Sequence, residues 1–188
     1  MSTSGPLFPV GLVVAGRSCL VVGGGRIAAR KVDQLVACGA DVTVVAPDVV
    51  PSLAARPDLD VQRRRYQRGE AAGYRLVITA TGDPAVDQLV FDDAEAAGVW
   101  VNAADDPARC SFTLPAVTRQ GPVTVSVATD GTSPALAAWL RDRLARALPE
   151  DLDRLAAEVA RLRDDLHETG RTTEGLPWPE LIDALAVA

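Results

Sequence analysis

The chain is poor in the residues that many enzymes use for metal or nucleophilic chemistry. Its 188 residues include one histidine, His167, and three cysteines at positions 19, 38 and 110, with no C-x-x-C spacing. A histidine-based metal site or a Ser-His-Asp triad therefore has little material, and we expect no metal-binding residues. Three separated cysteines are typical of free, buried thiols in a reducing compartment, so we expect a cytoplasmic protein.

Lysines, aromatic residues and long apolar runs are also scarce. Lys31 is the only lysine among 19 basic residues, and the net charge of −6 argues against a general nucleic-acid binder. No segment is long and apolar enough to cross a membrane, and residues 1–9 lack the features of a signal peptide. We therefore expect neither a nucleic-acid nor a membrane partner. Aromatic residues make up 4% of the chain and hydrophobic residues 48%, a balance that suits parallel strands covered by alanine-rich helices.

Strand and helix patterns alternate through the first part of the chain. Apolar and β-branched runs predict strands over residues 18–22, 42–46 and 76–80 and from residue 99. A further strand is predicted over residues 61–66, where the polar composition indicates a short edge strand. Helical periodicity lies between them, over residues 26–38 and 85–97. Such alternation predicts an α/β fold with a right-handed, Rossmann-type parallel sheet.

The pattern changes near residue 111. Two strand-like runs, 111–118 and 123–129, predict a hairpin, followed by helices over 134–148 and 151–168 and a Gly- and Pro-broken tail that docks loosely. We therefore predict a nucleotide-binding domain over residues 1–112, a dimerisation region over 113–148 and a C-terminal helical segment over 149–188. A hairpin alone is marginal in water, so a second copy of the chain is its simplest partner.

The most informative segment joins the first strand to the first helix. Leu20, Val21 and Val22 run into Gly23, Gly24 and Gly25, and Ala28 takes the third small position of a G-x-G-x-x-G/A fingerprint. The glycines allow a tight turn and a close approach to a pyrophosphate, which the amides of the helix start would bind. The segment predicts dinucleotide binding, although a plain strand-to-helix connection has a similar composition.

Two further loops follow predicted strands. A ribose-binding acid is expected roughly 20 residues past the glycines; Asp48, after Pro47, lies slightly late for this role, and Ala46 occupies the more usual position, so the backbone could hold part of the ribose. No arginine directly follows Pro47-Asp48 to meet a 2′-phosphate, which favours NAD over NADP. The alternative is that Pro47-Asp48 is only a turn. Thr81 lies in a polar turn after a later strand, where it could line the cofactor site.

Adjacent acids follow the last strand of this part. Asp105 and Asp106 are candidates for acid–base work. Asp106 precedes Pro107 and has the character of a turn residue, which leaves Asp105 as the better candidate to project into the cleft. A turn-capping aspartate is the alternative.

As a set, these motifs resemble the precorrin-2 dehydrogenase and sirohydrochlorin ferrochelatase family, which includes the N-terminal module of bacterial sirohaem synthase. The resemblance covers residues 8–148 in order. The matching residues are Phe8-Pro9, Val21 to Gly25, Ala28, Arg30-Lys31, Val42 to Val44, Ala46-Pro47, Ala80-Thr81, Asn102, Asp105, Pro107, Ser111-Phe112, Pro115-Ala116, Gly131 to Ala137 and Leu140-Arg141.

The resemblance implies NAD-dependent oxidation of precorrin-2 to sirohydrochlorin by a homodimer, with Fe²⁺ insertion as a further activity of the family. The family's catalytic aspartate falls on Asp105. Its cofactor contacts fall on the glycine turn, Arg26-Ile27, Pro47-Asp48 and Thr81. Arginine can bind the substrate's carboxylates in a bidentate manner, so Arg109, Arg119 and Arg141 are candidate substrate-binding residues, with Ser133 as a further candidate. The alternative is that each arginine is a solvated surface residue.

Two other classes of function stay open from the residues alone. One is a regulatory Rossmann module that senses a dinucleotide without catalysis, and the other is a structural dimeric subunit. The segment from Asn102 to Pro107 favours the enzyme, because a sensor needs no acid at the end of that strand.

Overall fold

Short runs of β-branched and aliphatic residues form five strands of a parallel sheet. They are β1 (Ser18–Val22), β2 (Asp41–Val45), β3 (Asp60–Gln62), β4 (Leu76–Thr79) and β5 (Trp100–Ala103). The strand order is β3-β2-β1-β4-β5, with every pair parallel. This confirms the predicted Rossmann-type sheet. From β1 the chain adds β2 and β3 on one side of the sheet and then β4 and β5 on the other side. Open α/β sheets bind their ligands at such a point, here between β1 and β4.

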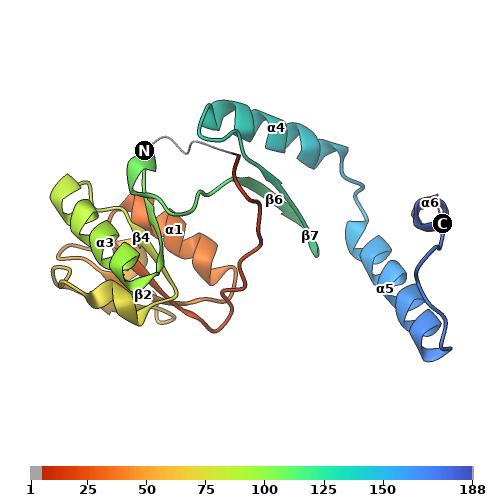
Figure 1. Ribbon diagram of the computed structural model, residues 1–188, viewed down its shortest axis with the longest axis horizontal. Coiled ribbons are helices and arrows are strands. Elements are labelled where there is room, and N and C mark those ends of the chain that lie inside the picture. The colour runs from red at the N-terminus through yellow and green to blue at the C-terminus, as the bar shows by residue number, and fades with distance from the viewer. Residues whose placement is uncertain (1–5, 188) are drawn as a thin grey trace. The chain divides into compact units, whose positions relative to one another are not determined.

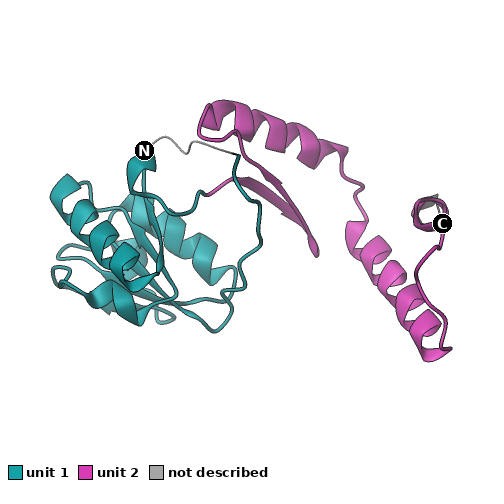
Figure 2. Ribbon diagram, viewed as in Figure 1, with its two compact units in different colours: residues 1–113 teal, residues 114–188 magenta. Residues whose placement is uncertain are grey.

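The computed structural model describes residues 6–187 (Figure 1). The chain divides into two compact units, residues 1–113 and 114–188 (Figure 2). The separate helical segment expected from residue 149 stays a prediction.

Two helices cover the two faces of the sheet. Helix α1 (Arg26–Val36) buries Ala28, Val32 and Leu35 against one face, and α3 (Pro84–Ala97) buries Val90 and Ala94 against the other. The core is therefore made of small aliphatic side chains, in agreement with the low aromatic content. The short helix α2 (Pro51–Ala54) and the 3₁₀ turns η1 (Glu70–Gly73) and η2 (Pro107–Arg109) complete this unit.

Local signals set the bounds of α3 close to those predicted. The Asp83 side chain accepts a hydrogen bond from the backbone N–H of Ala85, Pro84 takes the first helical position, and Gly98 ends the helix with a φ of 66°. A capping aspartate, an initial proline and a left-handed glycine are the usual start and stop signals of a helix.

The outer edge of β5 is covered by the segment that follows it. Cys110 forms an antiparallel bridge with Asn102, and the Ser111 N–H donates to the Val101 carbonyl at 2.8 Å. The predicted start of the first hairpin strand at residue 111 was therefore wrong, because that strand begins at Ala116. Residues 111 and 112 belong with the sheet, because Phe112 packs against the core beneath α1.

The second unit begins with the predicted hairpin. Strands β6 (Ala116–Gln120) and β7 (Val123–Val127) are antiparallel, and α4 (Pro134–Ala147) packs on them. Valines alternate with Thr124 and Ser126 along β7, so one face is apolar and the other polar. Each strand has one neighbour in this two-stranded sheet, which leaves both outer edges open within the described residues.

The C-terminal tail differs from its prediction. After α5 (Leu152–Glu168), residues Trp178–Val187 form a helix, α6, rather than a loosely docked tail. The Arg154 guanidinium donates to the Leu185 carbonyl of α6, and the Trp178 indole N–H donates to the Thr173 carbonyl. These contacts between elements fix a helix that is too short for its own periodicity to reveal. Within residues 6–187, no helix has the length and apolar character needed to cross a bilayer.

Candidate functional site

A cleft lies at the carboxyl ends of β1, β2 and β4. Its volume is about 780 Å³, within the range of small-molecule sites. The predicted cofactor residues Gly23, Gly24, Gly25, Pro47, Asp48 and Thr81 all line it. Three loops that are separate in sequence therefore form one site at the position where the strand order reverses.

Two of the glycines allow these loops to touch. A methyl group on Gly23, whose φ is 129°, would overlap the Ala80 carbonyl, and one on Gly24 would overlap the Asp48 carbonyl. The Gly23 N–H donates to the Val45 carbonyl and the Val50 N–H to the Gly24 carbonyl, both at 2.9 Å. Gly23 and Gly24 thus shape the cleft through close contacts with the backbone of the two neighbouring loops.

Gly25 has a different environment. A methyl group on it would meet no atom within 4 Å, and its φ of −85° suits any residue. It is the N-cap of α1 but provides no side-chain cap, and the first turn of α1 holds no acid, whereas Asp83 and Ser133 cap α3 and α4. The free amides and partial positive charge of this helix start fit a pyrophosphate.

The wall of the cleft formed by Thr81 is held by a half-buried acid. Asp87 of α3 accepts hydrogen bonds from the hydroxyls of Thr79 and Thr81, the latter at 2.7 Å. The Thr81 hydroxyl also accepts from the Asp83 N–H at 3.0 Å. These bonds fix the turn after β4 before any ligand arrives.

Two polar residues of the cleft were missed by sequence reasoning. Arg65 and Tyr66 line it beyond β3. The Tyr66 hydroxyl donates to Asp93 and accepts from the Ala71 N–H, both at 3.0 Å, and burial raises the pKa of this phenol, so it is a neutral structural wall. Arg65 adds a cation to the cleft that also holds Asp48; the run Arg63 to Arg65 was visible in the sequence, but β3 is too short to show which arginine faces the cleft.

Asp105 stands on the next loop along the same edge. It is exposed, lies outside the residues that line the cleft, and has a left-handed φ of 64°. The Ala104 N–H donates to the Thr79 carbonyl at 2.8 Å, and the Asp106 N–H to the Ala103 carbonyl at 3.3 Å. The turn thus holds Asp105 in a conformation that non-glycine residues rarely adopt, beside the end of β4, the strand that leads into the turn of Thr81.

Asp106 has the structural role expected of it. Its carboxylate accepts from the Ala108 N–H at 3.1 Å and pairs with Arg109, whose guanidinium also donates to Gln88 at 2.7 Å. The Arg109 side chain is therefore already engaged, and its predicted role in substrate binding stays a prediction.

The other candidates are not among the residues that line the cleft. Arg26 and Ile27 are exposed on the first turn of α1. Ser133, the N-cap of α4, accepts from the Leu136 N–H at 3.2 Å, and the half-buried Arg141 pairs with Asp142 at 2.6 Å. Arg119 is exposed on β6. Ser133, Arg119 and Arg141 belong to the second unit.

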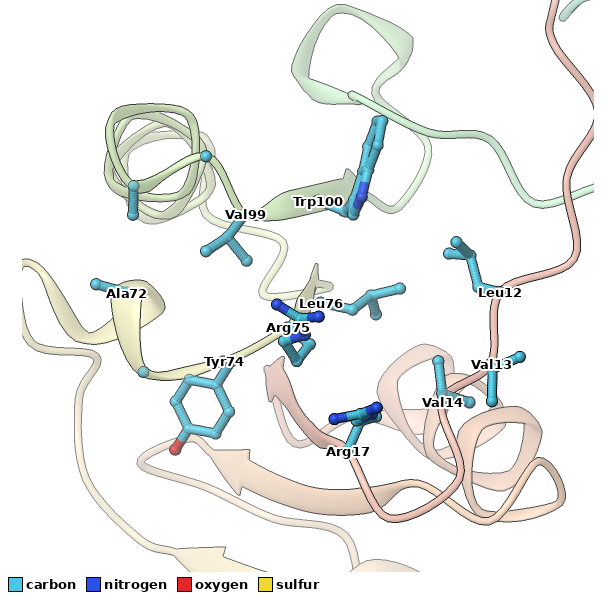
Figure 3. A pocket seen from close by; sticks show the side chains of 13 residues that line it. Leu12, Val13, Val14, Arg17, Ala72, Tyr74, Arg75, Leu76, Val99 and Trp100 are labelled. Atoms are coloured by element: carbon cyan, nitrogen blue, oxygen red, sulfur yellow. The ribbon is translucent and has the colours of Figure 1, made fainter.

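A separate cavity, with a volume of about 490 Å³, lies at the opposite edge of the sheet. Figure 3 shows the side chains that line it. Arg17, Arg75, Leu12 and Trp100 lie around it, where β1, β4 and β5 begin. Because α/β sheets bind ligands at the carboxyl ends of their strands, we do not assign the cofactor to this cavity.

The cysteines are free thiols, but only Cys19 is fully buried; Cys38 and Cys110 are partly exposed. The expectation of three buried thiols was therefore correct for one. Burial raises the pKa of Cys19 to about 11, with Asp41 adding to the effect. Neutral, enclosed thiols of this kind are inert.

Comparison with known proteins agrees with this geometry. Residues 10–116 match the NAD_binding_7 family model of NAD(P)-binding domains, and residues 120–147 match the model for the central part of sirohaem biosynthesis proteins. The chain belongs to the precorrin-2 dehydrogenase and siroheme synthase family. NAD is accordingly its cofactor, as predicted.

The relatives in this family are longer than the chain. A siroheme synthase of Nitrosococcus oceani is 37% identical over 93% of the chain and 38% of the relative. One of Pseudomonas putida is 42% identical over 79% of the chain and 32% of the relative. The chain thus spans about a third of these proteins. In contrast, the structure of SirC, precorrin-2 dehydrogenase, is 27% identical with a TM-score of 0.72, over 95% of the chain and 89% of that protein.

Proposed function

We propose that the protein oxidises precorrin-2 to sirohydrochlorin with NAD⁺. The observation that carries the proposal is the position of Asp105, an exposed carboxylate in a constrained turn on the same sheet edge as a dinucleotide cleft. A sensor or a structural subunit has no use for an acid held there. The structural likeness to SirC and the matches to siroheme synthases support the choice of substrate.

The residues divide the work of the reaction between them. Bound NAD⁺ supplies an acceptor for the hydride that leaves the macrocycle. The glycine turn and the start of α1 would hold the pyrophosphate, and Thr81, which donates to Asp87, would border the cofactor site. The oxidation also releases a proton, and the Asp105 carboxylate accepts it or stabilises the positive charge that precedes its loss.

The substrate's carboxylates need cations. Arg119 and Arg141, with the helix start at Ser133, are the proposed contacts from the second unit, and Arg109 is proposed from the first. Arg109 would keep its bond to Gln88 and exchange its pairing with Asp106 for a substrate carboxylate. For Fe²⁺ insertion, the ligands would be the macrocycle's nitrogens, because residues 6–187 hold no group of three side chains suited to a metal.

The direct test is turnover. Protein mixed with precorrin-2 and NAD⁺ is expected to produce the absorbance of sirohydrochlorin, with NADH formed in equal amount. NADP⁺ is expected to support slower turnover, because Asp48 at the ribose end would repel a 2′-phosphate. Absence of turnover with either cofactor would contradict the enzyme and favour a dinucleotide sensor or a structural subunit. Faster turnover with NADP⁺ would contradict the preference for NAD⁺ and assign Arg65 as the partner of the 2′-phosphate.

We also propose a cytoplasmic homodimer. The hairpin has open edges within the described residues, and Trp139, Leu136 and Leu144 of α4 are 55%, 46% and 43% exposed. Large apolar side chains gathered on one helix mark an interaction surface. The three free thiols suit the reducing cytoplasm.

Sedimentation at micromolar concentration is expected to give about twice the chain mass of 19.7 kDa. Trp139→Glu should shift the protein toward monomer, because a charge in an apolar interface is costly. Arg146→Glu, at an exposed position on the same helix, serves as the matched control. A monomer with full activity would contradict the dimer.

A further inference from the structure

The cavity at the edge where β1, β4 and β5 begin has positive charge on its wall. It lies within the first compact unit. Of the side chains in residues 6–187 that line it, the charged ones are Arg17 and Arg75, and none is an aspartate or a glutamate. The chain as a whole has a net charge of −6. A concave site with charge of one sign concentrates ligands of the opposite sign, so this cavity favours anions.

The two arginines start from adjoining backbone positions. Arg17 directly precedes β1 and Arg75 directly precedes β4, and these two strands are paired. The Arg75 N–H donates to the carbonyl of Ser18, the residue after Arg17, at 2.9 Å. The Arg17 N–H donates to the Val14 carbonyl, also at 2.9 Å. The backbone thus holds both guanidinium groups at one cavity (Figure 3), where they can meet a single anionic group.

Both guanidinium groups are available to a ligand. Within residues 6–187, neither Arg17 nor Arg75 forms an ion pair or a side-chain hydrogen bond. In contrast, Arg56 and Arg64 of the same unit each pair with a carboxylate. Like charges at neighbouring positions repel each other, and an anion between them relieves that repulsion. Guanidinium groups bind carboxylate and phosphate through paired N–H···O hydrogen bonds.

An apolar wall stands beside the arginines. Trp100, the first residue of β5, is 52% exposed, and Leu12 and Val13 are also exposed; all three line the cavity. Trp100 is in register with Leu76, the residue that follows Arg75. Exposed large apolar side chains that gather at one place mark a binding surface, and the face of an indole ring stacks on other flat rings. The cavity therefore offers an apolar contact next to its positive charge.

We propose that this cavity is a second ligand site, for an organic anion that carries a carboxylate or phosphate group on a flat apolar body. The anionic group would lie between Arg17 and Arg75, and the body against Trp100. The volume of about 490 Å³ is in the range of small-molecule sites. The cofactor cleft lies at the opposite edge of the sheet, so both sites can be filled at once. The inference does not depend on the proposed oxidation of precorrin-2.

Three matched probes test the site on the full-length protein. Naphthoate carries a carboxylate, naphthyl phosphate carries a phosphate, and naphthamide has the same rings without charge. Both anions are expected to bind saturably, and naphthamide at least roughly tenfold more weakly. The tighter anion identifies the preferred charged group. Equal affinity of naphthamide and the anions, or no saturable binding of either anion, would overturn the proposal.

The indole N–H signal of Trp100 locates the bound probe. The chain has three tryptophans, so the signal that disappears from the NMR spectrum of Trp100→Phe belongs to Trp100. This signal is expected to shift as naphthoate or naphthyl phosphate is added. A Trp100 signal that stays in place at saturation would show that the probes bind elsewhere and would overturn the proposal.

Charge-removing variants assign the arginines. Arg75→Gln and, independently, Arg17→Gln are expected to weaken binding of both anions at least roughly tenfold and to leave naphthamide unchanged. Arg63→Gln is the matched control, because Arg63 is an exposed arginine of the same unit that does not line the cavity; its affinities should match wild type. All three positions are exposed, so the melting temperatures should also match. Wild-type anion affinity in both Arg17→Gln and Arg75→Gln would overturn the proposal.

A competition with NAD⁺ separates the two sites. Saturating NAD⁺ is expected to leave the affinity for naphthoate unchanged, and Arg75→Gln is expected to leave the affinity for NAD⁺ unchanged. Displacement of naphthoate by NAD⁺ would place the probe in the cofactor cleft and overturn the proposal. If the protein does not oxidise precorrin-2, the proposed function is wrong while the probes still report on this cavity.

Discussion

Asp105→Asn is expected to abolish most sirohydrochlorin formation while NAD⁺ still binds. Acid–base groups contribute ~10²–10⁴-fold to turnover, so the loss should be of that size in kcat. Asparagine is the matched replacement because it also tolerates the left-handed backbone at this position, where φ is 64°. Asp105→Ala should lose at least as much activity, with an added strain of roughly 1 kcal/mol or more in the turn.

The neighbouring acid provides the control. Asp106→Asn removes the charge that pairs with Arg109 but keeps an oxygen for the Ala108 N–H. It should change turnover by only a few-fold and lower the melting temperature slightly, since a partly exposed ion pair is worth about 0–1 kcal/mol. Wild-type oxidation by Asp105→Asn would show that the aspartate assigned through the family resemblance is not the proton acceptor in this chain.

Gly25→Ala and Gly24→Ala are expected to separate cofactor binding from folding. At Gly25 the added methyl group meets no protein atom and φ is −85°, so the fold should keep its stability. The same methyl group would stand where a pyrophosphate approaches the α1 amides. NAD⁺ affinity should fall at least about tenfold, a change of roughly 1.4 kcal/mol, as measured by calorimetric titration.

At Gly24 the order of effects reverses. The methyl group would overlap the Asp48 carbonyl, which is backbone and cannot rotate away. Overpacking of this kind typically costs about 1–3 kcal/mol, so Gly24→Ala should show a lower free energy of unfolding in urea before any ligand is added. Equal melting temperatures for wild type and Gly24→Ala would contradict this expectation and show that the loop after β2 can move away from the glycine turn at little cost.

Much of the α/β unit was predictable because its signals are local. The glycine turn, the Asp83 cap and the Gly98 stop each act within a few residues, and the predicted strands at 18–22 and 76–80 agree with the structure to within one residue. The cofactor loops could be brought together in advance because the carboxyl ends of parallel strands share one edge of the sheet.

What could not be predicted depends on contacts between distant elements. Helix α6 is fixed by Arg154, thirty-one residues before Leu185. The segment at 110–112 follows the edge of β5 because Asn102 and Val101 offer it partners there.

The two units end their sheets differently, and this matters for handling the protein. The five-stranded sheet stops at a three-residue strand on one side and is covered by residues 110–112 on the other, whereas the hairpin offers two bare backbone edges within the described chain. Bare edges invite strands from other molecules and promote aggregation. A fragment that ends near residue 113 would thus be the better-behaved one in concentrated solution, and isotope labelling or crystallisation of the cofactor cleft can be planned around it.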